Sequence, residues 1–122
     1  MNVKEDQRGA HTVLAVAGTL ALGENTRLLQ ERFEAISTER SGALIFEMSG
    51  LEHLDSTAVG VLVGGLKRFE AQGRRFYLVA PRERVASVFR ITHLDQVFRT
   101  FPTVEAAVKS ADLATEEQTS EH

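Results

Sequence analysis

The sequence predicts a single α/β domain: a small mixed β-sheet with about four α-helices. Short apolar runs bounded by turn residues alternate with longer segments in which apolar residues recur every three or four positions. The first two strand-like runs are separated by only a few residues around Gly9, so they predict an antiparallel hairpin. Later strands are separated by helices, which predicts parallel pairing through right-handed crossovers. A chain of 122 residues is long enough to bury the core of one domain.

The N-terminal half contains three strand candidates and one helix. Residues 2–7 are a weak strand candidate and residues 11–17 a stronger one. A helix follows from Asn25 or Thr26 and ends at a glycine, with its apolar stripe made by Leu29, Phe33 and Ile36. The apolar run 43–48 predicts a buried strand, and residues 49–54 are expected to form a loop.

The C-terminal half continues the alternation. We expect a second helix at 56–72 ended by Gly73, a strand at 75–80, a third helix through residues 85–92 and a short edge strand at 96–99. Pro102 and Thr103 open a last helix, whose apolar face is Val104, Ala107, Val108 and Ala111. Residues 1–113 therefore form the domain, and the polar, acidic residues 114–122 are expected to be a disordered tail.

Composition excludes several classes of protein. The net charge is −3, and no basic stripe interleaved with aromatic residues is visible, so nucleic acid is not expected as a partner. There is no cysteine, which fits a reducing compartment, and no apolar run of membrane-spanning length. The N-terminus also lacks the apolar core of a signal peptide, so we expect a cytoplasmic protein that does not bind a membrane.

Common catalytic arrangements are also not found. The four histidines have no metal-ligand spacing, so no metal and no cofactor are expected. His53 precedes Ser56 by three residues, but no nucleophile elbow surrounds the serine, and His53 is expected on a surface loop near the binding site. Gly60, Gly64 and Gly65 fall inside the second helix, where small residues let a helix lie close to a sheet, and do not form a phosphate loop. For Glu47, we expect the carboxylate to accept hydrogen bonds from loop N–H groups.

The junction Leu54-Asp55-Ser56-Thr57-Ala58 is the most informative part of the chain. It joins the expected loop to the second helix, so Asp55, Ser56 and Thr57 lie at a helix N-terminus. Such a position has unpaired N–H groups and the positive end of the helix dipole, and it attracts negative charge. Ser56 is therefore either part of a capping sequence or a place for a phosphate, and local sequence alone leaves both interpretations open.

The segment from Leu44 to Arg68 resembles the central signature of STAS domains, and more narrowly that of bacterial anti-sigma factor antagonists. In this family an apolar strand leads to Asp-Ser-Ser/Thr-Gly and an amphipathic helix. The similarity continues through Gly73, the strand 76–79 and Ile91-Thr92-His93-Leu94-Asp95, and it ends at Val104-Glu105-Ala106-Ala107. It covers nearly the whole chain except the acidic tail.

The resemblance implies a partner-switching function without enzymatic activity. In the family, the serine after the aspartate is phosphorylated by a partner that is both anti-sigma factor and GHKL-type serine kinase, and that serine corresponds to Ser56. The dephosphorylated antagonist binds the kinase and displaces the sigma factor, phosphorylation breaks the complex, and a PP2C-type phosphatase restores it. Asp55 is expected to orient the serine by accepting backbone N–H bonds. The other residues expected at the partner interface are His53, Thr57, Ala58, Gly60, Gly64 and Lys67.

Three residues depart from the family pattern. Ala58 replaces the usual glycine, Glu47 stands where Asp or Asn is common, and His93 stands where glycine is frequent. His93 therefore has to adopt or avoid a left-handed backbone.

Alternatives remain open at this point. STAS-like proteins also serve as interaction subunits without a phospho-switch, in lipid-transport ABC complexes or stress-signalling scaffolds. A small-molecule or nucleotide binder would require a pocket at the loop ends of the sheet. An exposed edge strand would also allow a homodimer.

Overall fold

The computed structural model describes residues 1–21 and 23–120, with side chains for residues 1–21, 23 and 25–114. It contains a six-stranded mixed sheet and four α-helices, which confirms the predicted fold class. The strands are β1 (Asn2–Arg8), β2 (His11–Leu20), β3 (Leu44–Glu47), β4 (Leu51–Leu54), β5 (Phe76–Val79) and β6 (Arg99–Phe101). The helices are α1 (Glu24–Glu39), α2 (Ser56–Ala71), α3 (Glu83–Ile91) and α4 (Val104–Ser120), with a single 3-10 turn, η1 (Leu94–Gln96).

The strand order is β1-β2-β3-β5-β6, and β4 pairs with the end of β2. β1 and β2 form the expected antiparallel hairpin, with Gly9 in a left-handed conformation at its turn (φ +61°). All other pairs are parallel, as the alternation of strands and helices predicts. The hairpin therefore supplies one edge of an otherwise parallel sheet.

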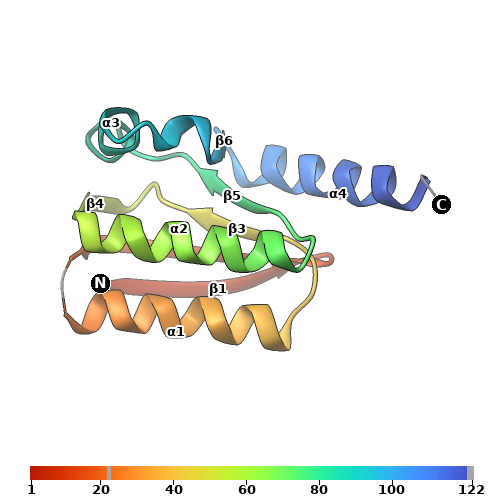
Figure 1. The fold of residues 1–122 in the computed structure, drawn as a ribbon, viewed down its shortest axis with the longest axis horizontal. Helices are drawn as coiled ribbons and strands as arrows, with labels where there is room; N and C mark the ends of the chain where they lie inside the picture. The colour runs from red at the N-terminus through yellow and green to blue at the C-terminus, as the bar shows by residue number, and fades with distance from the viewer. Residues whose placement is uncertain (22, 121–122) are drawn as a thin grey trace.

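The two faces of the sheet are covered unequally. α1 and α2 lie side by side over one face, and α3 packs on the same side (Figure 1). Alternate residues of each strand point to this face, among them Leu44 and Phe46 of β3, while Ile45 between them points to the face covered by α4.

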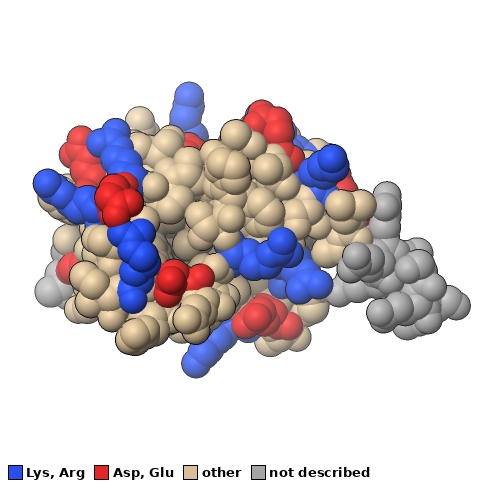
Figure 2. Space-filling model, turned by 90° about the horizontal axis from the view of Figure 1, so that it is seen from above, with Lys and Arg blue, Asp and Glu red and all other residues tan. Residues whose placement is uncertain are grey.

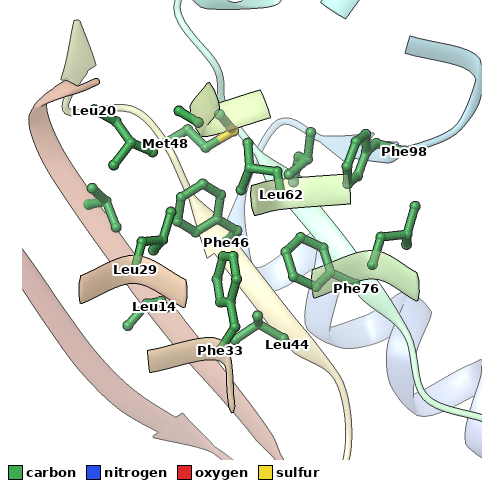
Figure 3. Packing of buried hydrophobic residues seen from close by; sticks show 14 of the residues in the cluster. Leu14, Leu20, Leu29, Phe33, Leu44, Phe46, Met48, Leu62, Phe76 and Phe98 are labelled. Carbon is green, nitrogen blue, oxygen red and sulfur yellow. The ribbon is translucent and has the colours of Figure 1, made fainter. Parts of the chain in front are cut away.

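The larger core lies between the sheet and α1, α2 and α3. Phe33 of α1 packs edge-on against Phe46 and Phe76, with ring centroids 5.8 and 5.3 Å apart (Figure 3). These rings form the centre of a cluster that fixes α1 and α2 relative to the strands.

The stretch after β3 differs from the sequence prediction. Residues 49–54 are not all loop, because Leu51–Leu54 forms β4, which pairs in parallel with Gly18, Thr19 and Leu20 of β2. Leu51 is buried, but Glu52 and His53 after it are both exposed, so the segment lacks the apolar pattern of a buried strand.

Two boundaries at the C-terminal side also differ. The edge strand expected at 96–99 lies three residues later, because Leu94–Gln96 forms a 3-10 turn and β6 begins at Arg99. The helix opened by Thr103, whose Oγ1 accepts a hydrogen bond from the Ala106 N–H at 3.1 Å, runs to Ser120. The tail boundary expected at residue 114 therefore falls inside α4, and residues 121–122 lie outside the described part of the chain.

Two of the family departures have a clear structural setting. His93 adopts the left-handed conformation that glycine would favour (φ +61°), directly before η1. The Glu47 carboxylate accepts a hydrogen bond from the Ser49 N–H at 2.8 Å, as expected for a side chain that emerges at the end of its strand.

Candidate functional site

Ser56 is the first residue of α2 and is exposed, as is Thr57 beside it. Within the described part of the chain, the Ser56 hydroxyl makes no hydrogen bond. The helix N-terminus presents backbone N–H groups and the positive end of the helix dipole at this position. The site therefore combines an accessible hydroxyl with surroundings that stabilise an anion.

Asp55 holds this turn in place. It is the N-cap residue, with an extended backbone (φ −104°, ψ 179°), and its Oδ1 accepts a hydrogen bond from the Ala58 N–H at 2.9 Å. Its own N–H donates to the Leu20 carbonyl at the end of β2, at 3.2 Å. The second bond attaches the cap to the sheet. The first is the backbone N–H bond that the Asp55 side chain was expected to accept.

Ala58 lies on the inner side of the same turn. Its side chain is fully buried in the core between helix and sheet. Its N–H is the donor to Asp55, so an alanine satisfies this helical position without strain. The expectation that Ala58 forms part of the accessible interface is therefore corrected: it supports the turn from beneath.

The exposed side of α2 continues away from Ser56. Gly60, Gly64 and Lys67 are exposed and spaced by four and three residues, so they share one face of the helix. A Cβ atom added at Gly60 or Gly64 would meet nothing within 4 Å. The interpretation that these two glycines let the helix approach the sheet is thus wrong for both.

Gly65 alone has that packing role. A Cβ atom at this position would lie 2.8 Å from Phe33 Cδ2 and 3.0 Å from Phe76 Cε2. The helix surface over Ser56, Gly60 and Gly64 is instead smooth and open, which suits close approach of another protein.

A shallow groove of about 300 Å³ runs beside this surface, between α1 and α2. Its α2 side includes Thr57, Gly60 and Gly64, and its α1 side includes Gln30 and Glu34. The sequence did not identify the α1 residues, because nothing in their local pattern distinguishes them from an ordinary solvent-exposed helix face.

A second group of side chains lies on β4 and the start of α3. His53 is exposed, and its ring nitrogens lie 3.2 and 3.5 Å from a guanidinium nitrogen of Arg84. Glu52 forms an ion pair with Arg82 at 3.9 Å, and Arg82 donates to the Ser49 carbonyl at 2.7 Å. His53 thus contacts α3. The sequence did not identify Arg82 and Arg84, because they meet residues 49–54 only when that segment pairs with β2.

Other kinds of site are not found in the described part of the chain. No cluster of three His, Asp or Glu side chains within it is placed to hold a metal ion. None of its helices combines the length and apolar character needed to cross a bilayer. On the face that carries α3, acidic and basic side chains are intermixed around uncharged residues, without a single-sign stripe (Figure 2).

Comparison with known proteins agrees with this geometry. Residues 2–107 match the family model of the STAS domain. A candidate anti-sigma factor antagonist of Thermotoga neapolitana is 32% identical over 87 residues, which cover 70% of this chain and 77% of that protein. The crystal structure of a candidate anti-sigma factor antagonist of Thermotoga maritima superposes with a TM-score of 0.84 at 25% identity, over 90% of this chain and 94% of that one.

A more distant structure has the same fold. The Bacillus cell fate determinant SpoIIAA, solved in its phosphorylated form, superposes with a TM-score of 0.70 at 21% identity, over 89% of this chain and 98% of that one. The match of the family model over most of the chain and the identity to the Thermotoga protein lead to one conclusion: this chain belongs to the STAS domain family of anti-sigma factor antagonists.

Proposed function

We propose that this protein binds an anti-sigma factor with serine-kinase activity, releases a sigma factor from it, and is itself released when Ser56 is phosphorylated. The observation that carries the proposal is the placement of an exposed Ser56 at the first position of α2, directly after the capping residue Asp55 and beside the open helix surface at Gly60 and Gly64. The existence of a phosphorylated form of SpoIIAA, which has the same fold, supports phosphorylation as the switch.

The helix N-terminus explains how the fold tolerates the modification. A phosphate on Ser56 would add about −1.5 to −2 charges. At the positive end of the α2 dipole this charge is stabilised by about 0.3–1 kcal/mol. Phosphorylation therefore leaves the domain folded and changes only its outer surface.

The same charge would weaken a packed interface. A partner that covers Ser56 in the unmodified protein must desolvate the phosphate and accommodate it next to the Asp55 carboxylate. Contact between like charges costs several kcal/mol, and each 1.4 kcal/mol changes affinity about tenfold. A loss of two or more orders of magnitude thus requires no rearrangement of the protein.

The interface that we propose includes Ser56, Thr57, Gly60, Gly64 and Lys67, with Asp55 as the residue that positions the turn. His53 lies at its margin, beside Arg84. A kinase of the GHKL class is the partner, and a PP2C-type phosphatase restores the unmodified form.

The first test uses four baits on a native extract: wild type, Ser56→Ala, Ser56→Asp and the control Ser41→Asp. The control adds the same charge at an exposed residue outside the proposed interface and should still retain the partner. We expect wild type and Ser56→Ala to retain a GHKL-type kinase, identified by mass spectrometry, and Ser56→Asp to lose it. The purified kinase with ATP should then phosphorylate wild type at residue 56 and leave Ser56→Ala unmodified.

Two outcomes would contradict the proposal. If all four baits retain the same transporter or scaffold subunits, the protein is an interaction subunit without a phospho-switch. If the kinase modifies Thr57 in place of Ser56, the acceptor is wrongly assigned, although the binding surface stands.

A further inference from the structure

The hairpin strand β1 forms one edge of the sheet. Its seven residues, Asn2–Arg8, all pair with β2 on one side, and no strand in the described part of the chain pairs with the other side. All of them except the half-buried Val3 are exposed. The opposite edge, β6, has only three residues. A long exposed edge of this kind offers a row of backbone N–H and C=O groups to another strand.

The side chains of β1 alternate between two surroundings. Lys4 lies opposite Ala15 and Asp6 opposite Val13, which packs in the cluster beneath α4, so both point to the α4 face. Glu5 points to the other face, where its carboxylate oxygens lie 3.3 Å from Arg32 of α1 and 3.8 Å from Arg40, the residue directly after α1.

From this pattern we infer that β1 is a dimerisation edge, on which the β1 strand of a second copy of this chain pairs antiparallel with Glu5 at the two-fold axis. In that register Lys4 lies opposite Asp6 of the partner subunit, and Asp6 lies opposite the partner's Lys4. Opposite charges placed across an antiparallel pair are stabilising.

The charges select this register over its neighbours. The α4 faces of the two subunits lie on the same side of the joined sheet only if directly opposed residues come from the same face of β1. The register can therefore shift only by an even number of residues. Centring the axis on Lys4 would oppose two lysines, and centring it on Asp6 would oppose two aspartates and place Lys4 against the partner's Arg8. The Glu5-centred register also pairs all seven residues of the strand, because Glu5 is its middle residue.

The two Glu5 side chains that meet at the axis do not oppose the dimer strongly. Each is held by Arg32 and Arg40 of its own subunit, and its side chain is only 26% exposed. Leu28, one turn before Arg32 on the same side of α1, is 48% exposed. A second copy that approaches this edge is expected to cover it.

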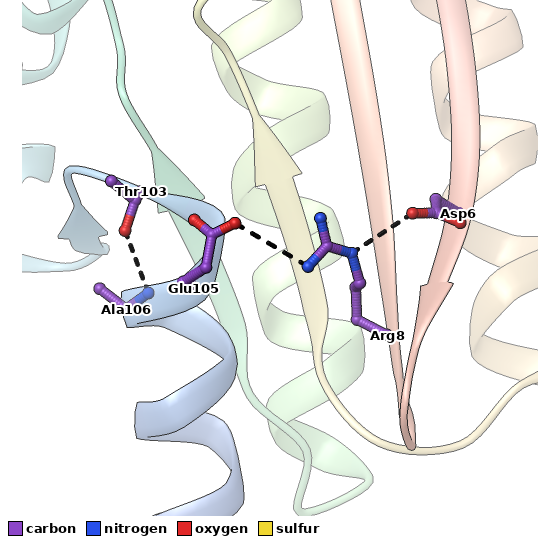
Figure 4. Close-up of polar contacts among 5 residues, drawn as sticks. All are labelled: Asp6, Arg8, Thr103, Glu105 and Ala106. Carbon is purple, nitrogen blue, oxygen red and sulfur yellow. Dashed lines mark hydrogen bonds and ion pairs between the residues drawn. The ribbon is translucent and has the colours of Figure 1, made fainter.

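Charged residues on an edge normally oppose pairing with other strands. Here Lys4 and Asp6 repel like charges on most other strands and in most other registers. In the Glu5-centred register they attract the opposite charges of a second copy. Asp6 also lies 3.4 Å from Arg8, which lies 3.9 Å from Glu105 of α4 (Figure 4). These ion pairs are exposed, so they contribute little to stability and leave Asp6 available.

The first experiment measures mass by sedimentation velocity at about 50 mM salt, where screening is weak. We expect wild type to be dimeric. For Lys4→Asp and for Asp6→Lys, we expect the dissociation constant of the dimer to be at least about tenfold higher than that of wild type. Mixing the two variants in equal amounts should restore a 1:1 dimer, because every cross-strand charge pair is then complementary. The double variant Lys4→Asp/Asp6→Lys should dimerise by itself for the same reason.

Wild type that stays monomeric, or variants that remain monomers when they are mixed, would overturn the proposal. The far-UV circular dichroism spectrum of each variant, compared with that of wild type, checks that the substitution leaves the secondary structure content unchanged.

The second experiment tests the register with single cysteines, since the chain has none of its own. Glu5→Cys should form an intersubunit disulfide on mild oxidation, because opposite residues have Cβ atoms about 4.5–5.5 Å apart. Gln7→Cys, on the same face, should not, because two Gln7 positions would lie about 14 Å apart along the strands. Equal cross-linking of both variants would contradict the Glu5-centred register.

Discussion

The Asp55 carboxylate and the Ala58 N–H are joined by a hydrogen bond of 2.9 Å, and this contact decides how the first turn of α2 presents its side chains. Asp55 closes the turn, Ala58 is buried beneath it, and Ser56 and Thr57 are left on the outside. A capping residue thus stands next to the exposed serine that we propose as the phosphorylation site, so capping by Asp55 does not occupy the Ser56 hydroxyl.

Replacing the cap should destabilise the domain. We expect Asp55→Ala to lower the free energy of unfolding by about 1 kcal/mol, because the Ala58 N–H loses its acceptor. Asp55→Asn retains an acceptor oxygen and should stay near wild type. Urea unfolding measures the difference, and equal losses for the two variants would show that the charge of Asp55 matters more than its hydrogen bond.

Alanine substitutions at the three glycines of α2 should change the free energy of unfolding in different directions. Gly65→Ala places a Cβ atom against Phe33 and Phe76, so we expect a loss of about 1–3 kcal/mol. Gly60→Ala and Gly64→Ala enter open space in a helix and should gain about 0.5–1 kcal/mol. Thermal melts of the three variants test this order.

The same variants separate folding from binding. If Gly60 and Gly64 lie in the partner interface, their alanine variants should bind the kinase more weakly despite their higher stability. Unchanged binding by both would place the interface elsewhere on the molecule.

Arg74 and Arg75 are adjacent but should differ in their tolerance of lysine. The Arg74 guanidinium donates to the Gly42 carbonyl at 2.7 Å and to the Ser37 carbonyl at 3.0 Å, and it lies 4.4 Å from the Phe69 ring centroid. Burial lowers the pKa of Arg74, although an arginine remains protonated at any ordinary pH. A lysine at position 74 cannot donate to both carbonyls in the planar geometry of a guanidinium. Arg74→Lys should therefore lower the free energy of unfolding by about 1–3 kcal/mol, whereas Arg75→Lys, at an exposed position, should leave it unchanged.

His11 connects the start of β2 to α4. Its Nδ1 accepts a hydrogen bond from the Ala43 N–H at 2.9 Å, which leaves Nε2 to donate to Asp112 at 2.7 Å. His11→Phe should cost about 1–3 kcal/mol, since the buried Ala43 N–H loses its partner. Asp112→Ala removes a partner whose side chain is 60% exposed, so water can replace the carboxylate at Nε2. It should therefore cost less than His11→Phe, as chemical denaturation of both variants would show.

The sequence predicted correctly those strands and helices whose apolar residues are the ones buried in the core. The apolar runs gave β3 and β5 and the periodic segments gave the helices, because each element has an apolar side that the core requires. β4 was missed because its formation depends on pairing with the distant end of β2, while the two exposed residues Glu52 and His53 interrupt its apolar pattern.

The local geometry around Ser56 was predicted in part. The position of Ser56 and the bond from Ala58 to Asp55 follow from the capping pattern, which is local. The contributions of Gln30, Glu34, Arg82 and Arg84 depend on how α1 and α3 pack, and no local pattern reports that. Gly60 and Gly65 are equivalent in the sequence, but only Gly65 faces Phe33.

The bond from the Asp55 N–H to the Leu20 carbonyl has a further consequence for recognition. It ties the serine-bearing turn to a strand inside the sheet, so this turn is already ordered before any partner arrives. Association then requires little loss of conformational entropy on this side of the complex. If Ser56 is phosphorylated as we propose, a turn ordered in this way cannot rearrange to move the phosphate out of the interface, so the added charge acts on the partner directly.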